Sequence, residues 1–310
     1  MKKIGLLIAI ALLSLSLFAQ EDGSTMEQPK KNPPHELPWK EENFGEFSEP
    51  VPLAYQRQSD VMYHVTIWRT IDLREKINHP LYFPVSPTGS WKSLAQVILD
   101  AIDSQGKGIE NPLAVYNDEL CQNVQTAESV RSTMNQVRTR PVFSEDGEEI
   151  GTESYDIAIE PSEILSYRIK EVWYFDKQRS ALKVHILTVQ PMLELVNEAQ
   201  DMNEEDSMDD DMENVGANIR LMAVGYLLYD DLRPYLAKQS VFNVRNSAQK
   251  MSLDDLLTHK RMFASQIIAK ENVYTNRQIQ EYITNPRDQV IESDKIREEI
   301  RVKEHDLWEF

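Results

Sequence analysis

The chain has 310 residues, with 33 Lys and Arg against 51 Asp and Glu, which gives a formal net charge of −18. This acidic balance argues against an electrostatic surface for nucleic acid or anionic lipid, and it favours solubility and the attraction of a basic partner. The single cysteine, Cys121, excludes an internal disulfide and a cysteine-built zinc cluster, so a packed core must supply the stability.

The first residues predict a secretory signal peptide. Two lysines precede an apolar run over residues 4–18 that is short for a membrane span, and Ala19 follows it. We expect residues 1–19 to be removed, with an uncleaved anchor as the alternative. Losing Lys2 and Lys3 would take the net charge from −18 to −20. The rest of the sequence has no second apolar stretch long enough to cross a bilayer, so no direct membrane span is expected.

Residues 20–60 predict an extended arm. Six of the fifteen prolines in the chain fall here, and they favour polyproline-like backbone over helix. A plain linker needs no aromatic residues, yet the arm carries Trp39, Phe44 and Phe47. We therefore expect the arm to pack on a surface, either of its own domain or of a partner, and these three residues are candidates for partner binding.

Residues 61–84, VMYHVTIWRTIDLREKINHPLYFP, predict a strand that leads into a short helix. Val61–Trp68 alternates with a period of two, and Asp72 has the spacing of a capping box, so a helix is expected over residues 73–78. The charged residues of this joint are Arg69, Asp72, Arg74, Glu75 and Lys76, and the Arg and Asp residues among them are expected to cap the helix and pair across it. The two following prolines predict a loop.

The middle of the chain predicts one clear helix and one clear hairpin. Apolar residues recur at helical spacing over Leu94–Ile102. Residues 167–191 predict two strands joined at Asp176–Ser180, inside a covered sheet because apolar and aromatic residues fill both arms. Asp146–Gly147 indicates a turn between shorter extended pieces.

The acidic stretch at residues 201–214 predicts a disordered loop, and it lacks the ligand spacing of a calcium site. Residues 218–230 predict a central strand. Ser252 is expected to cap a long helix with an apolar stripe that reaches Ile267, and a second helix is expected around residues 279–283.

Residues 286–310 predict a charged C-terminal helix with a narrow apolar stripe. Such a stripe indicates either partner contact or packing on the helix's own domain. The candidate partner-binding residues of this tail are Ile296, Ile300, Leu307, Trp308 and Phe310.

Together these patterns predict an α+β fold with a mixed or antiparallel sheet, packed helices, an extended Pro-rich N-terminal arm and a charged C-terminal helix. The expected divisions are a signal peptide (1–19), an arm (20–60), a core (61–285) and a tail (286–310). Whether the core splits into two lobes near residue 150 is left open.

No motif for a catalytic nucleophile, a phosphate-binding loop or a zinc site is present in the sequence. The six histidines lack zinc-binding spacing and are expected to be structural, and no carboxylate pair stands out. We therefore expect no catalytic residue, no metal and no cofactor.

Five stretches resemble the GldN family of gliding-motility proteins, called PorN in non-gliding relatives. They are TIDLREKINHPLYFP, SWKSLAQVILDAI, VWYFDKQRSALKVHILTVQP, MSLDDLLTHKRMFASQI and the ending EHDLWEF. The resemblance runs from about Val61 to Phe310, and the arm and the acidic stretch fall outside it.

The resemblance implies a component of the type IX secretion system of Bacteroidetes. It implies a periplasmic protein, held at the outer membrane through a lipoprotein of the GldK/PorK type. It also implies contact with the periplasmic part of a GldM/PorM-type motor protein, and self-association within a ring. The family brings no catalytic residues. We expect a non-enzymatic structural subunit, with a periplasmic small-ligand-binding module and an acid–base hydrolase as the alternatives.

Overall fold

The computed structural model describes residues 49–308, apart from 89–90, 105–112, 144–148, 158–159, 197–218, 242, 244–249, 273 and 275. Every described residue belongs to one compact unit, Phe44–Phe310. The predicted signal peptide, most of the arm, and the acidic stretch at 201–214 lie outside the described residues.

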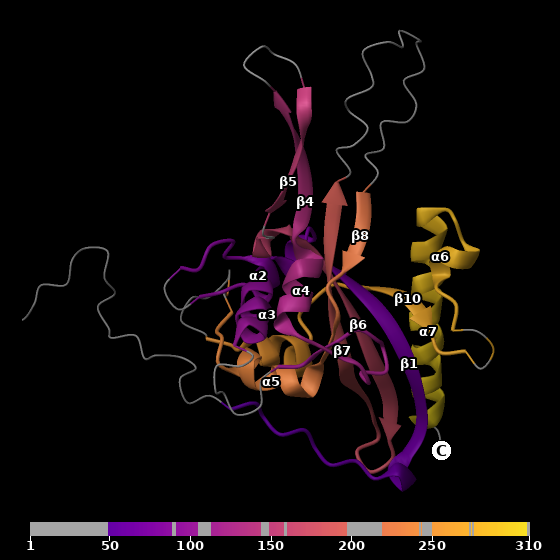
Figure 1. The fold of residues 1–310 in the computed structure, drawn as a ribbon. Coiled ribbons are helices and arrows are strands. Elements are labelled where there is room, and N and C mark those ends of the chain that lie inside the picture. Colours follow the sequence, from indigo (N-terminus) through magenta and orange to yellow (C-terminus); the bar gives the residue numbers. More distant parts are fainter. Residues whose placement is uncertain are drawn as a thin grey trace, which may run out of the picture. The chain divides into compact units, whose positions relative to one another are not determined.

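Eight antiparallel strands form the main sheet (Figure 1), which confirms the predicted α+β class. Their order is β10, β1, β6, β7, β9, β2, β3, with β8 paired to a separate part of β7. Strands from both sides of residue 150 enter this sheet. The strands are β1 (Val61–Asp72), β2 (Val115–Tyr116), β3 (Val124–Gln125), β6 (Ile164–Asp176), β7 (Ala181–Val196), β8 (Ile219–Ala223), β9 (Tyr226–Leu228) and β10 (Gln266–Lys270). A separate two-stranded sheet pairs β4 (Gln136–Phe143) with β5 (Glu149–Ile157).

The helices fall into two groups (Figure 1): α3, α4 and α5 lie together, while α6 and α7 lie beside β10. The helices are α2 (His79–Tyr82), α3 (Leu94–Asp103), α4 (Ala127–Met134), α5 (Tyr229–Ala237), α6 (Ile279–Tyr282) and α7 (Pro286–Trp308). Shorter helical turns are η1 (Gln58–Asp60), η2 (Lys76–Asn78), η3 (Pro161–Glu163) and the π-helical η5 (Asp255–Lys260). No helix within the described ranges is long and apolar enough to cross a membrane.

Two hydrophobic clusters lie on one face of the sheet. In the β1–β6 pairing, Ile67 lies opposite Glu171 and Ile71 opposite Tyr167. Alternate residues of a strand point to the same face, so these four side chains share one face. The larger cluster includes Ile71 and Tyr167 together with residues of α3, α4, α5 and η5. The smaller cluster consists of Val65, Ile67, Ile267, Ile279, Ile296 and Ile300.

Two predicted elements agree with the structure. In α3, the Ser93 hydroxyl at the N-cap accepts a hydrogen bond from the Gln96 backbone N–H at 3.3 Å, and apolar residues recur along the buried side. The β6–β7 hairpin turns after Asp176, whose carboxylate accepts the Gln178 backbone N–H at 3.0 Å and the Arg179 guanidinium at 2.8 Å.

The helix predicted over residues 73–78 is wrong for its first half, because residues 73–75 form a turn and only Lys76–Asn78 is helical. Instead of capping a helix, the Asp72 carboxylate accepts the Arg74 backbone N–H at 2.9 Å and pairs with the Arg74 guanidinium. Helical turns begin only at Lys76 and run on through Pro80, which the first turn of a helix tolerates because its N–H needs no partner there.

The predicted central strand at 218–230 is two strands and a helix start. The chain breaks at Gly225, whose φ of +146° disfavours any other residue, and a Cβ built there would lie 2.6 Å from Val115 Cγ1. Of the two strands, only β9 has neighbours on both sides. Helix α5 follows directly.

The long helix predicted after Ser252 is also wrong. The Ser252 hydroxyl accepts the Asp255 backbone N–H at 3.0 Å as expected, but the helix ends at Arg261 with a left-handed φ of +47°. The chain then runs extended because the side chain of buried Asn78 bonds both backbone groups of Ala264, at 2.8 and 2.9 Å. Ile267 therefore lies in a strand, β10.

A candidate binding groove on the open face of the sheet

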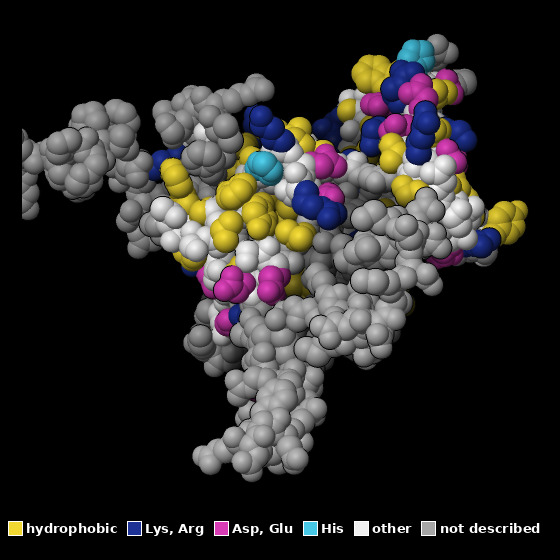
Figure 2. Space-filling model, turned by 90° about the horizontal axis from the view of Figure 1, so that it is seen from above, with side chains coloured by type: hydrophobic (Ala, Val, Ile, Leu, Met, Phe, Trp, Pro, Cys, Tyr) yellow, Lys and Arg dark blue, Asp and Glu magenta, His cyan; other side chains and the backbone are white. Residues whose placement is uncertain are grey.

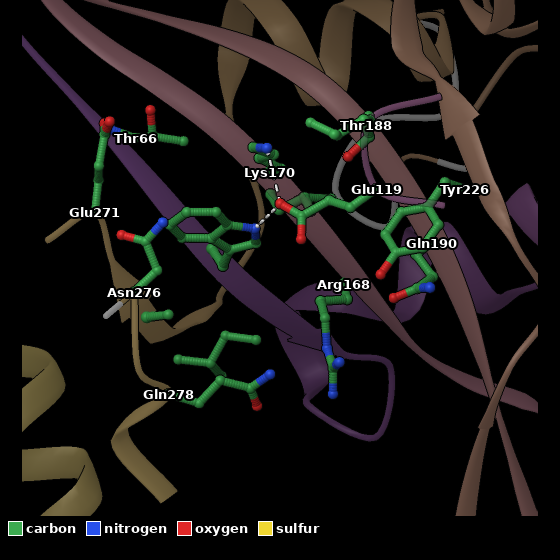
Figure 3. Close-up of a pocket in the computed structure, with 15 residues that line it drawn as sticks. Thr66, Glu119, Arg168, Lys170, Thr188, Gln190, Tyr226, Glu271, Asn276 and Gln278 are labelled. Carbon is green, nitrogen blue, oxygen red and sulfur yellow. Dashed lines mark hydrogen bonds and ion pairs between the residues drawn. The ribbon is translucent and has the colours of Figure 1, made fainter. Parts of the chain in front are cut away.

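A groove of about 370 Å³ crosses the face of the sheet that lies opposite the two clusters. Its lining comes from five neighbouring strands, β10, β1, β6, β7 and β9, and from two loops, residues 117–123 and 271–278 (Figure 3). The side chains that matter below are Thr66, Trp68, Glu119, Leu120, Arg168, Lys170, Gln190, Tyr226 and Glu271. The hairpin of residues 167–191 was predicted to lie inside a covered sheet, and this prediction is wrong for the face on which the groove opens.

The first wall of the groove is the loop at residues 117–123, fixed to the sheet by Glu119. The Glu119 carboxylate accepts the Trp68 indole N–H at 2.8 Å and pairs with Lys170 Nζ at 2.8 Å (Figure 3). Lys170 Nζ also lies 5.2 Å from the Trp68 ring centroid, a cation–π contact. These contacts leave Glu119 and Lys170 neutralised by each other, so both act as structural groups of the wall.

The loop has its own internal support. The Asp118 carboxylate accepts backbone N–H groups from Asn123 at 2.8 Å and Gln122 at 3.1 Å, and these bonds lower the pKa of the Asp118 carboxyl. Cys121 sits at a left-handed φ of +54°, and burial raises the pKa of its thiol. A protonated thiol is a poor nucleophile, which argues against a catalytic role for Cys121.

The second wall is the loop at residues 271–278, which continues the pairing of β10 with β1. The Glu271 backbone N–H donates to the Thr66 carbonyl at 2.8 Å, and the Thr66 N–H donates to the Glu271 carboxylate at 3.0 Å. Hydrogen bonding from Thr66, aided by nearby His64 and Lys170, lowers the pKa of the Glu271 carboxyl. A carboxylate with a lowered pKa stays ionised and is a weak general base, so Glu271 is suited to holding the loop.

The floor contains a donor and an acceptor without partners. Gln190 is only 4% exposed, and within the described part of the chain its side-chain oxygen Oε1 has no hydrogen-bond partner. The same holds for the buried Nε of Arg168. The two residues are direct cross-strand neighbours in the β6–β7 pairing, and both line the groove (Figure 3). Both atoms have almost no exposed surface, so a ligand does not reach them in this arrangement of side chains.

The opposite face of β6, behind the groove, carries a buried charge cluster. The fully buried Glu171 carboxylate accepts bonds from Arg261 Nη2 at 2.8 Å, Trp173 Nε1 at 2.9 Å and Arg69 Nη1 at 3.3 Å. Burial lowers the pKa of the Arg69 guanidinium, and Glu171 partly offsets this effect. Of the arginines at the joint, Arg74 pairs with Asp72 as expected, whereas Arg69 pairs across strands with Glu171.

A second cavity, of about 770 Å³, is lined by residues 52–56 and by three histidines, His64, His185 and His259. His185 Nε2 lies 3.8 Å from an Asp230 carboxylate oxygen, and His259 Nδ1 lies 3.5 Å from Asp255. None of the described side chains lining this cavity has a buried polar atom without a partner.

Exposed apolar side chains also surround α2. Ile77, Phe83 and Val85 are each more than two-fifths exposed. Figure 2 shows hydrophobic side chains gathered on one face of the molecule, with charged side chains of both signs around them. Contiguous apolar surface of this kind is typical of a protein that contacts other proteins.

Among the predicted partner-binding residues that the structure describes, none lines the groove. Ile296 and Ile300, 7% and 1% exposed, pack in the smaller cluster, so for them the alternative of packing on their own domain holds. Leu307 is half-buried and Trp308 is 62% exposed, and both remain predicted contacts. Trp39, Phe44, Phe47 and Phe310 lie outside the described residues.

The sequence analysis did not predict the groove residues, although the pattern of polar residues in β6 indicated a polar face of the sheet. In β6 the polar residues Arg168 and Lys170 alternate with the buried Tyr167 and Ile169, which indicates a strand with one polar face. The pairing that sets Gln190 beside Arg168 depends on the bulge between Lys170 and Glu171, which sequence alone does not reveal.

No group of three or more His, Cys, Asp or Glu within the described ranges is placed to hold a metal ion. In a comparison with protein-family models, residues 56–309 match the model described as gliding motility associated protein GldN. The match includes every helix and strand described above. A comparison with curated proteins found no match.

Proposed function

Because the chain belongs to the GldN family of gliding motility associated proteins, we propose that it is a non-enzymatic structural subunit of the type IX secretion system. In this proposal the protein is exported to the periplasm and assembles into a ring. The ring is held at the outer membrane by a GldK/PorK-type lipoprotein and contacts the periplasmic part of a GldM/PorM-type motor protein. Its role is in protein secretion and, in species that glide, in motility.

The observation that supports a structural role is the state of the charged groups in the groove. Glu119 is neutralised by Lys170, and Glu271 is held by the Thr66 backbone. These groups build walls and are not poised for proton transfer. The groove offers a partner the exposed side chain of Leu120 and the half-buried aromatic rings of Trp68 and Tyr226.

The first experiment is deletion of the gene, with complementation by the intact chain. We expect loss of secreted proteins from the medium and their accumulation inside the cell, restored by complementation. Cross-linking and mass spectrometry on envelopes of the complemented strain should then recover an outer-membrane lipoprotein. Normal secretion in the deletion strain would overturn the proposal.

The groove also supports the second candidate, a periplasmic module that binds a small ligand. Its volume of about 370 Å³ falls at the lower end of known ligand pockets. A ring subunit and a small-ligand-binding module differ in which kind of ligand raises the stability of the folded protein. A small molecule that binds the native state raises the melting temperature of the isolated monomer, because it adds binding free energy to the folded state alone.

A further inference from the structure

One edge of strand β7 is only partly paired. β6 covers the first edge along residues 181–193, whereas the second edge is paired with β9 at residues 188–189 and with β8 at residues 192–196. At residues 182–186, no described strand or loop bonds the second edge. Residues of a strand direct their N–H and C=O groups to alternate edges, so about every second one of these residues has backbone groups that point outward. A free edge of this kind is a template for a further strand.

This free edge borders the cavity of about 770 Å³. Lys183, Val184 and His185 all line the cavity, and successive side chains of a strand point to opposite faces. The cavity therefore reaches both faces of β7 and passes its edge, which is the free one because β6 covers the other. The opposite wall is formed by residues 52–54 and the end of η5. Lys183 is exposed and its two neighbours are half-buried, so a ligand reaches this edge.

The cavity has room for a short stretch of one strand. In a sheet, one residue takes up about 3.3 Å along its strand, about 4.8 Å toward the next strand and about 10 Å through the sheet, or about 160 Å³. A volume of about 770 Å³ therefore holds about four to five extended residues. The free edge at residues 182–186 is about 16 Å long at the same rise per residue, so the space and the edge match in length.

The lining of the cavity favours an acidic side chain. None of its described lining residues is Asp or Glu, although the chain has 51 acidic against 33 basic residues. Arg179 pairs with Asp176 at 2.8 Å, whereas Lys183 has no ion pair within the described part of the chain. On a strand added at this edge, residues on the face of Lys183 meet an unpaired ammonium group, and residues on the other face meet the apolar side chain of Val184.

We propose that this edge of β7 binds an extended segment of a partner protein in which acidic and apolar residues alternate. The segment lies as an additional strand beside residues 182–186, with its acidic residues toward Lys183 and its apolar residues toward Val184. Backbone hydrogen bonds to the edge supply affinity, and the alternating side chains supply specificity. The inference goes beyond the proposed function, because this contact does not require a ring.

The test uses the full mature chain and a synthetic peptide, Glu-Val-Glu-Val-Glu amide, labelled with fluorescein at its amino end. Binding is measured by fluorescence anisotropy. Two further peptides carry N-methyl groups, one on both valines and the other on the three glutamates. Because N–H groups of a strand alternate between its two edges, we expect one methylated peptide to bind like the parent and the other not to bind. Equal binding of both, or no binding of the parent peptide up to its solubility limit, would overturn the inference.

A matched pair of lysine variants tests the role of charge. Lys183→Gln removes the unpaired ammonium group, and we expect the parent peptide to bind about threefold to fivefold more weakly, the effect of one exposed ion pair. Lys177→Gln is the control, because Lys177 is an exposed residue of the same hairpin and does not line the cavity. It should leave binding unchanged. An equal loss in both variants would mean that only the net charge of the chain matters, contrary to the proposal.

Hydrogen exchange locates the bound peptide on the chain. In the free chain, the outward amides among residues 182–186 should exchange fast, while those bonded to β6 exchange slowly. The parent peptide should slow exchange at the outward, alternate positions. Protection confined to another edge of the sheet would contradict the proposed site. A dimer of the chain that Lys183→Gln dissociates would replace the partner protein by a second copy and so overturn the assignment of the occupant.

Discussion

The buried cluster around Glu171 makes the sharpest stability prediction. Its carboxylate is fully buried and accepts bonds from three side chains, Arg69, Arg261 and Trp173, at 2.8–3.3 Å. The perturbation is Glu171→Gln, which keeps the shape and one acceptor oxygen but removes the charge. Two guanidinium groups are then left without the carboxylate between them.

The expected loss in the free energy of unfolding follows from the burial of Glu171 and its arginine partners. Removing one partner of a buried ion pair costs about 3–5 kcal/mol, because the remaining charge is left uncompensated. Arg69 is 11% exposed but Arg261 is 24% exposed, so water screens part of the remaining charge and the lower end applies. We expect the free energy of unfolding to fall by about 3 kcal/mol, from a total on the order of 5–15 kcal/mol. The melting temperature should fall by about 6–12 °C.

The assay is urea unfolding followed by circular dichroism, with thermal melts alongside. Glu298→Gln is the control, because Glu298 pairs with Arg301 on the exposed side of α7 and such a pair contributes little. The control should match the parent chain. If Glu171→Gln lowered the free energy of unfolding by less than about 1 kcal/mol, the view of this cluster as a compensated buried charge would be refuted.

Three further changes test the fold. Gly225→Ala should lower the free energy of unfolding by about 1–3 kcal/mol in urea melts, because residue 225 has a φ of +146° and an added Cβ would clash with Val115. An unchanged free energy of unfolding would mean that the turn relaxes to accept the Cβ. Ser293→Ala removes the acceptor of the buried Ile267 N–H, a bond of 2.9 Å, and hydrogen exchange at Ile267 should speed up while β6 stays protected. Burial favours protonation of Asp176, but hydrogen bonds at the hairpin turn lower its pKa. Its stabilisation is therefore present above pH 4 and is lost as the pH falls below about 4, and melts of Asp176→Asn should show a weaker acid dependence.

Periodicity was enough to predict the elements whose burial follows their own sequence. Helix α3 carries its apolar residues on one side and its own cap at Ser93, and the β6–β7 hairpin has a polar turn between two apolar strands. In both, local pattern and tertiary packing agree, so the sequence alone is sufficient.

The errors arose where a distant residue overrides the local pattern. Residues 261–267 continue a helical stripe, yet Asn78 bonds the backbone of Ala264 and draws the segment into an extended path. The apolar stripe of the C-terminal helix, at Ile296 and Ile300, is likewise consistent both with binding to a partner and with packing on the chain's own sheet. The groove was missed for the same reason, because Arg168 and Gln190 come together only through strand pairing.

The unequal size of the two hydrophobic clusters has a consequence for local unfolding. Helix α7 is held by the smaller cluster, by the Ser293 bond and by exposed pairs such as Lys270 with Glu299 at 2.6 Å. An element held by few buried contacts opens at a lower free energy than the rest of a domain. Helix α7 should therefore detach while the larger cluster stays folded, and this step would expose Ile296 and Ile300. Packing on the helix's own domain then describes the closed state of α7, and partner contact describes the detached state. A partner that binds Ile296 and Ile300 would shift the equilibrium toward the detached state.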